Sequence, residues 1–498
     1  MNVNPITRLD YPDLDVIRVE DTYYMVSTTM HFMPGCEILQ SFDLVHWEHV
    51  TYVYETLDHT DAQQLKSGHN IYGQGMWAAS LRYHEGRFYI CFVANDTRKT
   101  YLYTSEKIDG PWKKQLIEGF YHDGSLLFDE DGRNYIVYGN DEIWITELNE
   151  DLTAPKKDGL HRLLVSDHKN PELGYEGSHI QKINGYYYIF LVHSLRDRWM
   201  RTEACFYSDS LEGEFTGGDV LCDDRGYCGQ GVAQGGIVDT PDGKWYAMLF
   251  QDSGAVGRIP ILLPVTWKDY FPVFGQNGHV PEEIEVHSTR PGYIYQPLVG
   301  SDDFCNGLLP HWQFNHDPDP RYYHLDALQG TYTITTREVC TELTQAVNTL
   351  TQRMSYPSCA AEVTVDASAL KEGDVAGLCA LQGCYAAVGI TKHHGKYEVL
   401  MLDKKEDGIL DMTEGTVVES HQMDFRLEAD FCNMKDEARC YYRVNKGDWL
   451  PIGTVHKLYF KLDHFTGCRF GLFCYAAEET GGSACFRDFK YYDVDEIS

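Results

Sequence analysis

Three acidic residues of this chain hold the same position relative to a repeated sequence pattern. The pattern is a turn followed by an aromatic strand, and its last tyrosines are Tyr24, Tyr89, Tyr135, Tyr188 and Tyr246. Twelve residues before the last four tyrosines lie Trp77, Asp123, Glu176 and Gln234, and eleven residues before Tyr24, whose turn is one residue shorter, lies Asp13. Clustered like charges are costly unless a function or a cation requires them. Asp13, Asp123 and Glu176 are therefore candidate catalytic residues.

Carboxyl groups that face each other across a pocket suit the hydrolysis of glycosidic bonds. One carboxyl protonates the leaving oxygen, and the other activates water or attacks the anomeric carbon. The acid needs a raised pKa, which a neighbouring negative charge provides. We assign Glu176 as the acid because its longer side chain reaches a leaving group, Asp123 as the neighbouring charge and Asp13 as the base. The sequence has no G-x-S-x-G, H-E-x-x-H or P-loop motif, which disfavours other hydrolytic chemistries.

The repeated pattern also predicts the elements that must position these residues. Four of its five turns read Asp, Asn or Glu followed by Gly, which is a hairpin signal. The tyrosines are separated by 65, 46, 53 and 58 residues. Strand-only repeats of roughly 40 to 50 residues are typical of propeller blades, with longer steps holding loop insertions. We expect a five-bladed β-propeller whose innermost strands bring the five equivalent residues to the central axis.

A second domain is expected after residue 298, which makes the protein all-β. Residues 286–292 lack strand alternation and Pro297 follows them, so the linker is placed there. Alternating apolar and polar residues then predict separate strands at 331–335, 361–365, 387–391, 425–429 and 470–473. This pattern favours a β-sandwich. The predicted domains are a propeller over residues 1–298 and a sandwich over 299–498.

Composition narrows the classes of partner. The 498-residue chain carries a formal net charge of -33, which argues against nucleic acid or an anionic membrane surface. No apolar run approaches the roughly 20 residues that cross a bilayer. Fifteen cysteines without C-x-x-C pairs, and a start at Met1 without a basic and apolar leader, predict a reduced, cytoplasmic protein. The sequence leaves the oligomeric state open, a homo-oligomer included.

Further residues are candidates for binding substrate. Trp77 offers a flat apolar face for a sugar ring, although filling the propeller axis is the alternative. Phe32 and Met33 are weaker candidates of the same kind. Arg258 could hydrogen-bond sugar hydroxyls or hold a catalytic carboxylate, and a structural ion pair is the alternative.

These motifs resemble glycoside hydrolase family 43 over nearly the whole chain. Residues 12–18 look like the family's base motif, 122–126 like its pKa-modulator motif and 176–179 like its general-acid motif. Residues 75–79 and 257–260 are similar to its subsite tryptophan and its substrate-binding arginine. Residues 312–318, 348–353 and 371–378 resemble the concanavalin-like, jelly-roll sandwich of its β-xylosidase-like members, which packs on the propeller and helps close the pocket.

The resemblance implies an inverting mechanism with Asp13 as base, Asp123 as modulator and Glu176 as acid. It further implies an exo-acting enzyme that releases terminal β-D-xylose, α-L-arabinofuranose or both from xylo- and arabinoxylo-oligosaccharides. Leu14 and Gly124 stand where the family usually has proline, but neither change removes a carboxylate. Gln234 stands where many relatives have a histidine that faces a calcium ion on the axis. No cofactor is required by this interpretation, and an axial calcium with Gln234 as a ligand is left open.

Other functions remain open at this stage. One alternative is an α-L-arabinofuranosidase only, because the two pentoses present similar hydroxyl patterns. Another is a non-catalytic glycan-binding propeller, which would gain little from three clustered acids. A protein-interaction propeller would instead predict large exposed apolar patches.

Overall fold

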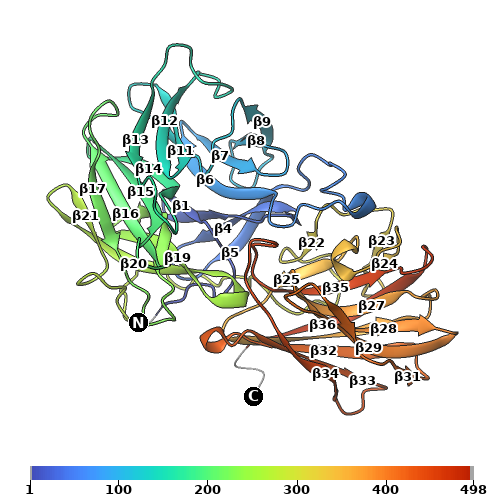
Figure 1. Ribbon diagram of the computed structural model, residues 1–498. Helices are drawn as coiled ribbons and strands as arrows, with labels where there is room; N and C mark the ends of the chain where they lie inside the picture. The colour runs from blue at the N-terminus through green and yellow to red at the C-terminus, as the bar shows by residue number, and fades with distance from the viewer. Residues whose placement is uncertain (1–2, 494–498) are drawn as a thin grey trace.

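The computed structural model describes residues 3–493, and almost all of its regular structure is β-strand. Within this range the helical elements are four short 3-10 turns, η1 (Lys66–Gly68), η2 (Gly254–Val256), η3 (Leu343–Gln345) and η4 (Cys432–Met434). None of the helices described is long and apolar enough to cross a membrane. Figure 1 shows two parts, an N-terminal part coloured blue to green and a C-terminal part coloured yellow to red.

The N-terminal part is a five-bladed β-propeller, as predicted. Each blade is a four-stranded antiparallel sheet whose strands are arranged in chain order, and in blade 1 the short strand β3 between β2 and β4 belongs to another sheet. Blade 1 contains β1 (Asp15–Val19), β2 (Thr22–Ser27), β4 (Gly35–Ser41) and β5 (Glu48–Tyr54), and blade 2 contains β6 (Met76–His84), β7 (Arg87–Ala94), β8 (Lys99–Ser105) and β9 (Lys113–Ile117). Blade 3 contains β10 (Ser125–Phe128), β11 (Asn134–Asn140), β12 (Glu142–Leu148) and β13 (His161–Ser166). Blade 4 contains β14 (Glu176–Ile183), β15 (Tyr186–Ser194), β16 (Arg201–Ser208) and β17 (Thr216–Leu221), and blade 5 contains β18 (Val232–Asp239), β19 (Trp245–Asp252), β20 (Arg258–Lys268) and β21 (Phe271–Phe274).

The turn residues explain the blade hairpins. Glu85-Gly86 and Asn184-Gly185 are two-residue turns in which both residues have positive φ, 47° and 78° in the first and 51° and 84° in the second. Such turns match the right-handed twist of paired strands. The Asp-Gly pairs of blades 3 and 5 instead lie in longer loops, because their flanking strands stop pairing earlier.

The N-terminal segment closes the propeller ring between blades 5 and 1. The backbone N–H of Ile6 donates to the carbonyl of Pro260 at 2.9 Å, and that of Tyr11 donates to the carbonyl of Arg258 at 3.0 Å. The Asn4 side chain makes two hydrogen bonds with the backbone of Leu262. Residues 4–11 thus run beside β20 and leave Asp13 at the entrance to blade 1.

A guanidinium group ties four blades together near the propeller axis. Arg82 of β6 donates to the carboxylate of Asp15 in blade 1 at 2.7 Å and to Leu126 and Ser125 of blade 3 at 2.8 and 2.7 Å. It also donates to the carbonyl of Ile180 in blade 4 at 3.1 Å. Burial raises the pKa of Asp15, but the charges of Arg82 and His179 outweigh burial and lower it to about 2. The axis therefore holds a carboxylate that the chain's own cations neutralise.

The C-terminal part is a sandwich of two antiparallel sheets. The first contains β22 (Gln313–Asn315), β25 (Leu350–Arg353), β35 (Arg469–Tyr475), β27 (Val375–Leu381), β28 (Ala386–His393), β29 (Lys396–Lys404), β30 (Leu410–Met412) and β31 (Thr416–Val418). The second contains β23 (Tyr323–Asp326), β24 (Thr331–Thr335), β36 (Ser483–Asp493), β26 (Ser358–Asp366), β32 (Gln422–Asp430), β33 (Glu437–Arg443) and β34 (Leu450–Lys457). The five predicted strands lie in β24, β26, β28, β32 and β35 and are confirmed.

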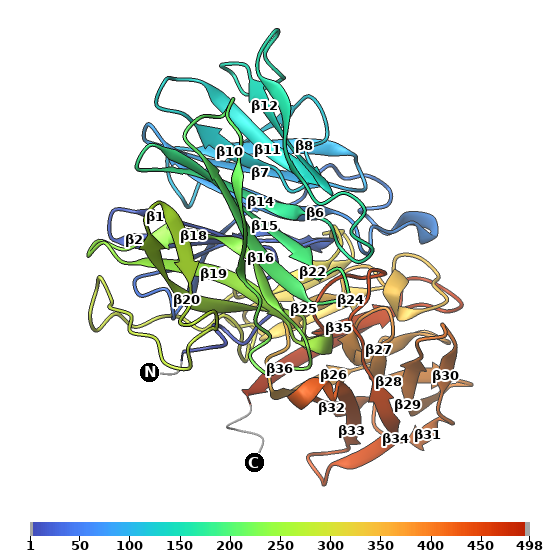
Figure 2. The same ribbon diagram turned by 60° about the vertical axis from the view of Figure 1, so that its left-hand side comes forward.

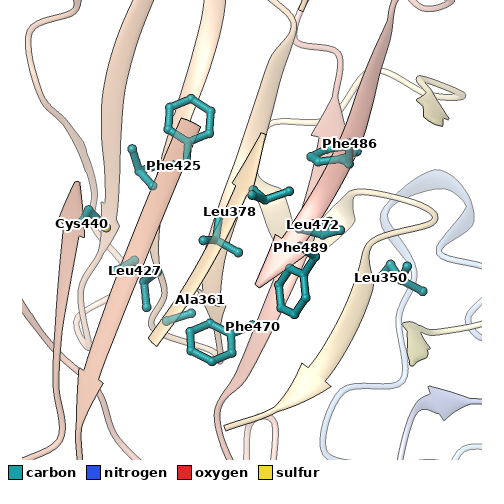
Figure 3. Close-up of a cluster of buried hydrophobic side chains, with 14 of the residues drawn as sticks. Leu350, Ala361, Leu378, Phe425, Leu427, Cys440, Phe470, Leu472, Phe486 and Phe489 are labelled. Atoms are coloured by element: carbon teal, nitrogen blue, oxygen red, sulfur yellow. The ribbon is translucent and has the colours of Figure 1, made fainter. Parts of the chain in front are cut away.

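The sandwich core lies between the inner faces of these sheets. Figure 3 shows Phe425 and Leu427 of β32 beside Leu378 of β27 and Phe470 and Leu472 of β35, all of them fully buried. Burying side chains of this size contributes about 1.5–3 kcal/mol each, before the cost of ordering the chain. Most of this core belongs to the sandwich, and Ala255, Val256 and Ile259 of the propeller join it.

The two parts share a sheet and a buried ion pair. β3 (Phe32–Met33), which leaves blade 1, pairs with β22 and forms the outermost strand of the first sandwich sheet. Arg353 of β25 donates to the carboxylate of Glu37 in blade 1 at 2.7 Å, and both side chains are buried. Figures 1 and 2 both show the sandwich against this side of the propeller. The strandless stretch between β21 and β22 contains the predicted boundary after residue 298, which stays a prediction.

Candidate active site

A cavity of about 550 Å³ lies at the end of the propeller that faces the sandwich. This volume is within the range of small-molecule sites. The propeller side of the wall is formed by Asp13, Trp77, His122, Asp123, Asn140, Glu172, Leu173, Glu176, Trp199, Arg201, Gln230, Gln234, Asp252, Gly254 and Arg258, and the sandwich side by Met434, Phe460, Lys461, Leu462 and Phe465. All five residues at the equivalent repeat position line this cavity, and so does Arg258.

Phe32 and Met33 do not line the cavity, so their prediction as substrate-binding residues is wrong. Both are buried in β3, where Phe32 packs under the guanidinium of Arg469 at 3.5 Å and Met33 joins the core between blades 1 and 2. The aromatic and apolar character that suggested sugar binding serves domain packing instead.

The equivalent residues lie at the beginning of the first strand of each blade, where the backbone bends. Asp13, Asp123 and Gln234 have φ of 51°, 48° and 64°, and Gly177 after Glu176 has φ of 65°. Irregular pairing accompanies the bend in blades 2, 4 and 5. Bulged residues of this kind redirect side chains, which explains how these groups reach the cavity. A Cβ on Gly177 would lie 2.7 Å from the Gln234 side chain, so this close approach requires glycine.

Asp13 is held by two donors. Arg258 Nη1 donates to Asp13 Oδ1 at 2.7 Å, and Thr28 Oγ1 donates to Asp13 Oδ2 at 3.0 Å. Both partners of the ion pair are buried. The carboxylate has a fixed orientation at the cavity wall because Arg258 pairs with it, while the predicted binding of sugar hydroxyls by Arg258 stays a prediction.

The sandwich helps to position Arg258. The carboxylate of Asp10 accepts hydrogen bonds from the backbone N–H groups of Arg258 at 2.7 Å and of Gly467 in the sandwich at 2.8 Å. The Arg258 guanidinium lies 4.3 Å from the ring centre of Phe465 and 4.9 Å from that of Phe250. Aromatic faces attract cations at this range. Thus Phe465 both covers the cavity and steadies the arginine that holds Asp13.

Asp123, Glu176 and His122 form a second group. Asp123 Oδ2 accepts a hydrogen bond from the backbone N–H of Gly177 at 2.9 Å. Glu176 Oε2 accepts one from Asn140 Nδ2 at 2.7 Å. His122 Nε2 lies 3.5 Å from an oxygen of each carboxyl group, so the imidazole sits between them.

His122 changes the expected electrostatics of the pair. Burial lowers the pKa of His122, but Asp123 and Glu176 raise it to about 9. Burial raises the pKa of Glu176, yet the hydrogen bond and charge of His122 outweigh burial and hold it below its usual value. Burial, aided by the charges of Glu176 and Asp13, raises the pKa of Asp123 to about 6. The prediction that the neighbouring acid raises the pKa of Glu176 is therefore wrong for the free site, because a cation lies between the two carboxyls.

Removal of the His122 imidazole should shift the pH profile of kcat/KM. We expect His122→Asn to raise the pKa of Glu176, because the mutation removes the hydrogen bond and charge that hold it low. The alkaline limb of kcat/KM, where a general acid loses its proton in the free enzyme, should move to higher pH. A pH–rate profile measures this, with His84→Asn, which lies outside the cavity, as the control. An alkaline limb that stays in place or moves down would contradict the assignment.

The cavity contains no convincing metal site among residues 3–493. His122, Asp123 and Glu176 do present ligating atoms within 4.8 Å of one another, but the imidazole has the spacing of an ion pair with both carboxyls. Calcium prefers six to eight oxygen ligands. Beside Gln234, the buried Glu203 accepts the Gln234 backbone N–H, and burial raises its pKa well above the usual value. These residues do not fit calcium, and the axial ion implied by the resemblance stays an unsupported prediction.

Two buried nitrogen atoms in the cavity wall have no hydrogen-bond partner in the described chain. They are Trp77 Nε1 and Arg201 Nη1. Leaving such groups unpaired is costly, so a ligand rich in hydroxyl groups suits this wall. His122, Arg201 and Asp252 are not among the site residues predicted from the sequence. His122 could have been found in the sequence because it precedes Asp123, one of the equivalent repeat positions. Arg201 and Asp252 have no such signal, since their ion pair at 2.9 Å appears only in the folded structure.

The chain is similar to known proteins over both of its domains. The sequence profile described as "Glycosyl hydrolases family 43" matches residues 3–272, and "Beta xylosidase C-terminal Concanavalin A-like domain" matches residues 301–492. A protein named "Beta-xylosidase" from Formosa agariphila is 27% identical, and the match covers 99% of this chain and 89% of that protein. A protein named "Non-reducing end alpha-L-arabinofuranosidase BoGH43B" from Bacteroides ovatus is 25% identical over 66% of this chain and 63% of that protein.

A solved structure titled "Bifunctional GH43-CE" from Bacteroides eggerthii is also similar, with a TM-score of 0.92 and 42% identity. The match covers 98% of this chain but 63% of that longer chain. The profile match spans more than half of the sequence and includes the three predicted catalytic acids, Asp13, Asp123 and Glu176. The chain is therefore a member of glycosyl hydrolase family 43, with a concanavalin A-like C-terminal domain, and it is a glycoside hydrolase.

Proposed function

We propose that this protein is an inverting, exo-acting glycosidase that releases terminal β-D-xylose, α-L-arabinofuranose or both from xylo- and arabinoxylo-oligosaccharides. The observation that carries the proposal is the division of the acids into two groups within one cavity. Asp13 is bound by Arg258, while Glu176 and Asp123 share His122. Two separately held carboxyls are what a reaction with an acid on one side of the sugar and a base on the other needs.

Asp13 acts as the base. Arg258 and Thr28 each hold one of its oxygens, so a lone pair has a fixed direction toward the water that attacks the anomeric carbon. The proton of that water passes to Asp13 while the glycosidic bond breaks. Holding the reacting groups in this way lowers the entropic part of the barrier.

Glu176 acts as the acid and protonates the leaving oxygen. Its pKa is low in the free site, so it must gain a proton as substrate binds. Two features support this step. A sugar that displaces water increases the burial of Glu176, which favours its neutral form. Asp123, with a pKa of about 6, and Glu176 both lie 3.5 Å from His122 Nε2, so a proton taken up by Asp123 has a short path to Glu176.

Two observations support a terminal pentose as the substrate: the residues that form the cavity wall, and the activities in the names of related proteins. The sandwich residues Phe460 and Phe465 form part of the cavity wall, and a cavity closed by a second domain suits one terminal sugar better than the interior of a long chain. Relatives that cover nearly all or two thirds of the chain carry the names of β-xylosidases and of an α-L-arabinofuranosidase. An enzyme that cleaves arabinofuranosides only is the second candidate, favoured by the latter similarity.

The test is hydrolysis of aryl β-D-xylopyranoside and aryl α-L-arabinofuranoside, followed by proton NMR of the first sugar released. We expect turnover of at least one substrate, and an α-xylose product from the β-xyloside before mutarotation. The ratio of kcat/KM values then identifies the preferred sugar. A β-xylose product would contradict inversion, and the absence of turnover with either substrate would contradict the proposed substrate class.

A further inference from the structure

We propose that three buried histidines, His31, His316 and His464, form an acid-sensitive latch that holds one wall of the cavity closed. His31 belongs to the propeller, while His316 and His464 belong to the sandwich. In acid, protonation of these imidazoles releases the sandwich loop 458–468, between β34 and β35, from the propeller. The latch acts on the shape of the cavity and does not depend on which sugar the cavity binds.

The three imidazoles pack around Tyr72 at the junction of the two domains. The ring centre of His31 lies 4.8 Å from that of His316 and 5.8 Å from that of His464. Tyr72 of the propeller stacks on His464 at 3.9 Å and meets His316 edge-on at 4.5 Å. His31 and His316 are fully buried, and His464 is 7% exposed. The cluster therefore joins two propeller loops to two segments of the sandwich through ring contacts.

The closed cluster suits neutral imidazoles. The backbone N–H of Ile71 donates to His316 Nε2 at 3.0 Å, and a protonated ring could not accept this hydrogen bond. None of the three histidines forms an ion pair with a carboxylate among residues 3–493, whereas the buried His193 and His456 each pair with an aspartate. A proton added to the closed cluster would therefore be a buried charge without an ion-pair partner, which is costly.

The surroundings of the cluster also disfavour a proton. The charged groups nearest to its rings are Arg469, Lys404, Glu342 and Asp463. Burial and the neighbouring imidazoles lower the pKa of His31 and His316 well below the usual value, and Arg469 adds to this effect at His31. Burial lowers the pKa of His464 to about 4, although the charge of Asp463 acts in the opposite direction.

His464 is next to residues that close the cavity. Phe465 follows it directly and lies 4.3 Å from the Arg258 guanidinium, and Leu462 precedes it by two residues. Phe465 and Leu462 line the cavity, whereas His464 packs into the cluster. A Cβ on Gly73 would lie 2.2 Å from the Leu462 carbonyl oxygen, so the loop sits directly on the propeller. Release of His464 would therefore move Phe465 away from Arg258 and open this wall.

The rest of the domain interface withstands the same acid. Burial raises the pKa of Glu37, but the charge of Arg353 and the contact with His49 outweigh burial and lower it to about 2. The ion pair between Glu37 and Arg353 thus keeps its charges in mild acid. The pairing of β3 with β22 uses backbone groups that do not titrate. Acid should therefore release the loop while the two domains stay joined.

The direction of the pH effect follows from the two states of the loop. The closed loop holds neutral imidazoles, whereas release exposes them to water, where the ordinary histidine pKa is about 6.5. The closed form is therefore favoured above about pH 6.5 and loses stability as the pH falls toward the His464 pKa of about 4. At about pH 5, each histidine shifts the equilibrium toward release by about 30-fold, and all three by on the order of 10⁴-fold.

Hydrogen exchange of the full chain, measured by mass spectrometry from about pH 7 to about pH 4.5 and corrected for the intrinsic pH dependence of exchange, tests the latch. The N–H of Cys468 donates to the carbonyl of Ala255 in the propeller at 2.8 Å, so its exchange reports release. We expect residues 458–468 to lose protection below about pH 6 while β27 and β32 stay protected. His464→Phe keeps a ring beside Tyr72 but removes one titrating group, so release at about pH 5 should be about 30-fold less favourable. Its pH dependence should also be less steep by one proton.

The matched control is His324→Phe, which makes the same change at an exposed histidine of β23 and should follow the wild type at every pH. Protection of residues 458–468 that persists to about pH 4.5 in the wild type would overturn the latch, even if the His464 variant does not fold. Release with the same steepness in His464→Phe would overturn it as well. Loss of protection in β27 and β32 at the same pH would show unfolding instead of local release. Each of these results is independent of whether a pentoside is hydrolysed.

Discussion

Glu176→Gln is expected to lower kcat/KM for unactivated oligosaccharides by about 10²–10⁴-fold, the usual contribution of a general acid. Glutamine keeps the size of the side chain and the hydrogen bond from Asn140 but has no proton to give. The loss should shrink as the leaving group becomes more acidic, because a dinitrophenolate departs without protonation. Steady-state rates with xylobiose, a nitrophenyl xyloside and a dinitrophenyl xyloside measure this trend.

The control for this experiment is Glu214→Gln, which makes the same change at an exposed glutamate of blade 4. It should change none of the three rates. A Glu176→Gln loss of the same size for every leaving group would contradict an acid role and would instead indicate a residue that binds or activates water.

Asp13→Asn is expected to cause a loss of similar size, about 10²–10⁴-fold, that does not depend on the leaving group. The base acts on water, so activating the departing group does not bypass it. Arg258 keeps Asp252 as an anionic neighbour, so its buried charge is not left alone in the variant. The same three substrates measure the effect, and a thermal melt verifies that the variant is folded.

The two variants are controls for each other. The proposed roles require a loss that depends on the leaving group for Glu176 and one that does not for Asp13. If the Asp13 variant recovers on activated substrates and the Glu176 variant does not, the roles are reversed.

The fold could be predicted from the sequence because its local signals agree with each other. The Glu85-Gly86 and Asn184-Gly185 turns demand positive φ, and aromatic strands follow them at nearly regular steps. The sandwich strands alternate because only one of their faces meets the core. The short strand β3 could not be predicted, because its partner β22 lies far along the chain and pairing is a tertiary property.

The acidic residues of the site could be predicted because the repeat fixes their place in each blade. Their electrostatics could not. The His122 imidazole lies between the carboxyls of Asp123 and Glu176, next to a residue with positive φ. Residue spacing encodes neither this backbone conformation nor the orientation of the imidazole. Trp199 and Phe465 reach the cavity from loops outside the repeat, so no periodicity identified them.

Strand β3 joins the propeller to a sheet of the sandwich, and this limits how the two domains can be separated or exchanged. A propeller cut away from its partner would lose the strand that pairs with β3 and would leave the buried Glu37 without Arg353. Removing one member of a buried ion pair strongly destabilises a protein. The two domains should therefore behave as one cooperative unit in unfolding. Such a C-terminal domain is poorly suited to exchange between enzymes, and both domains are expected to be inherited together.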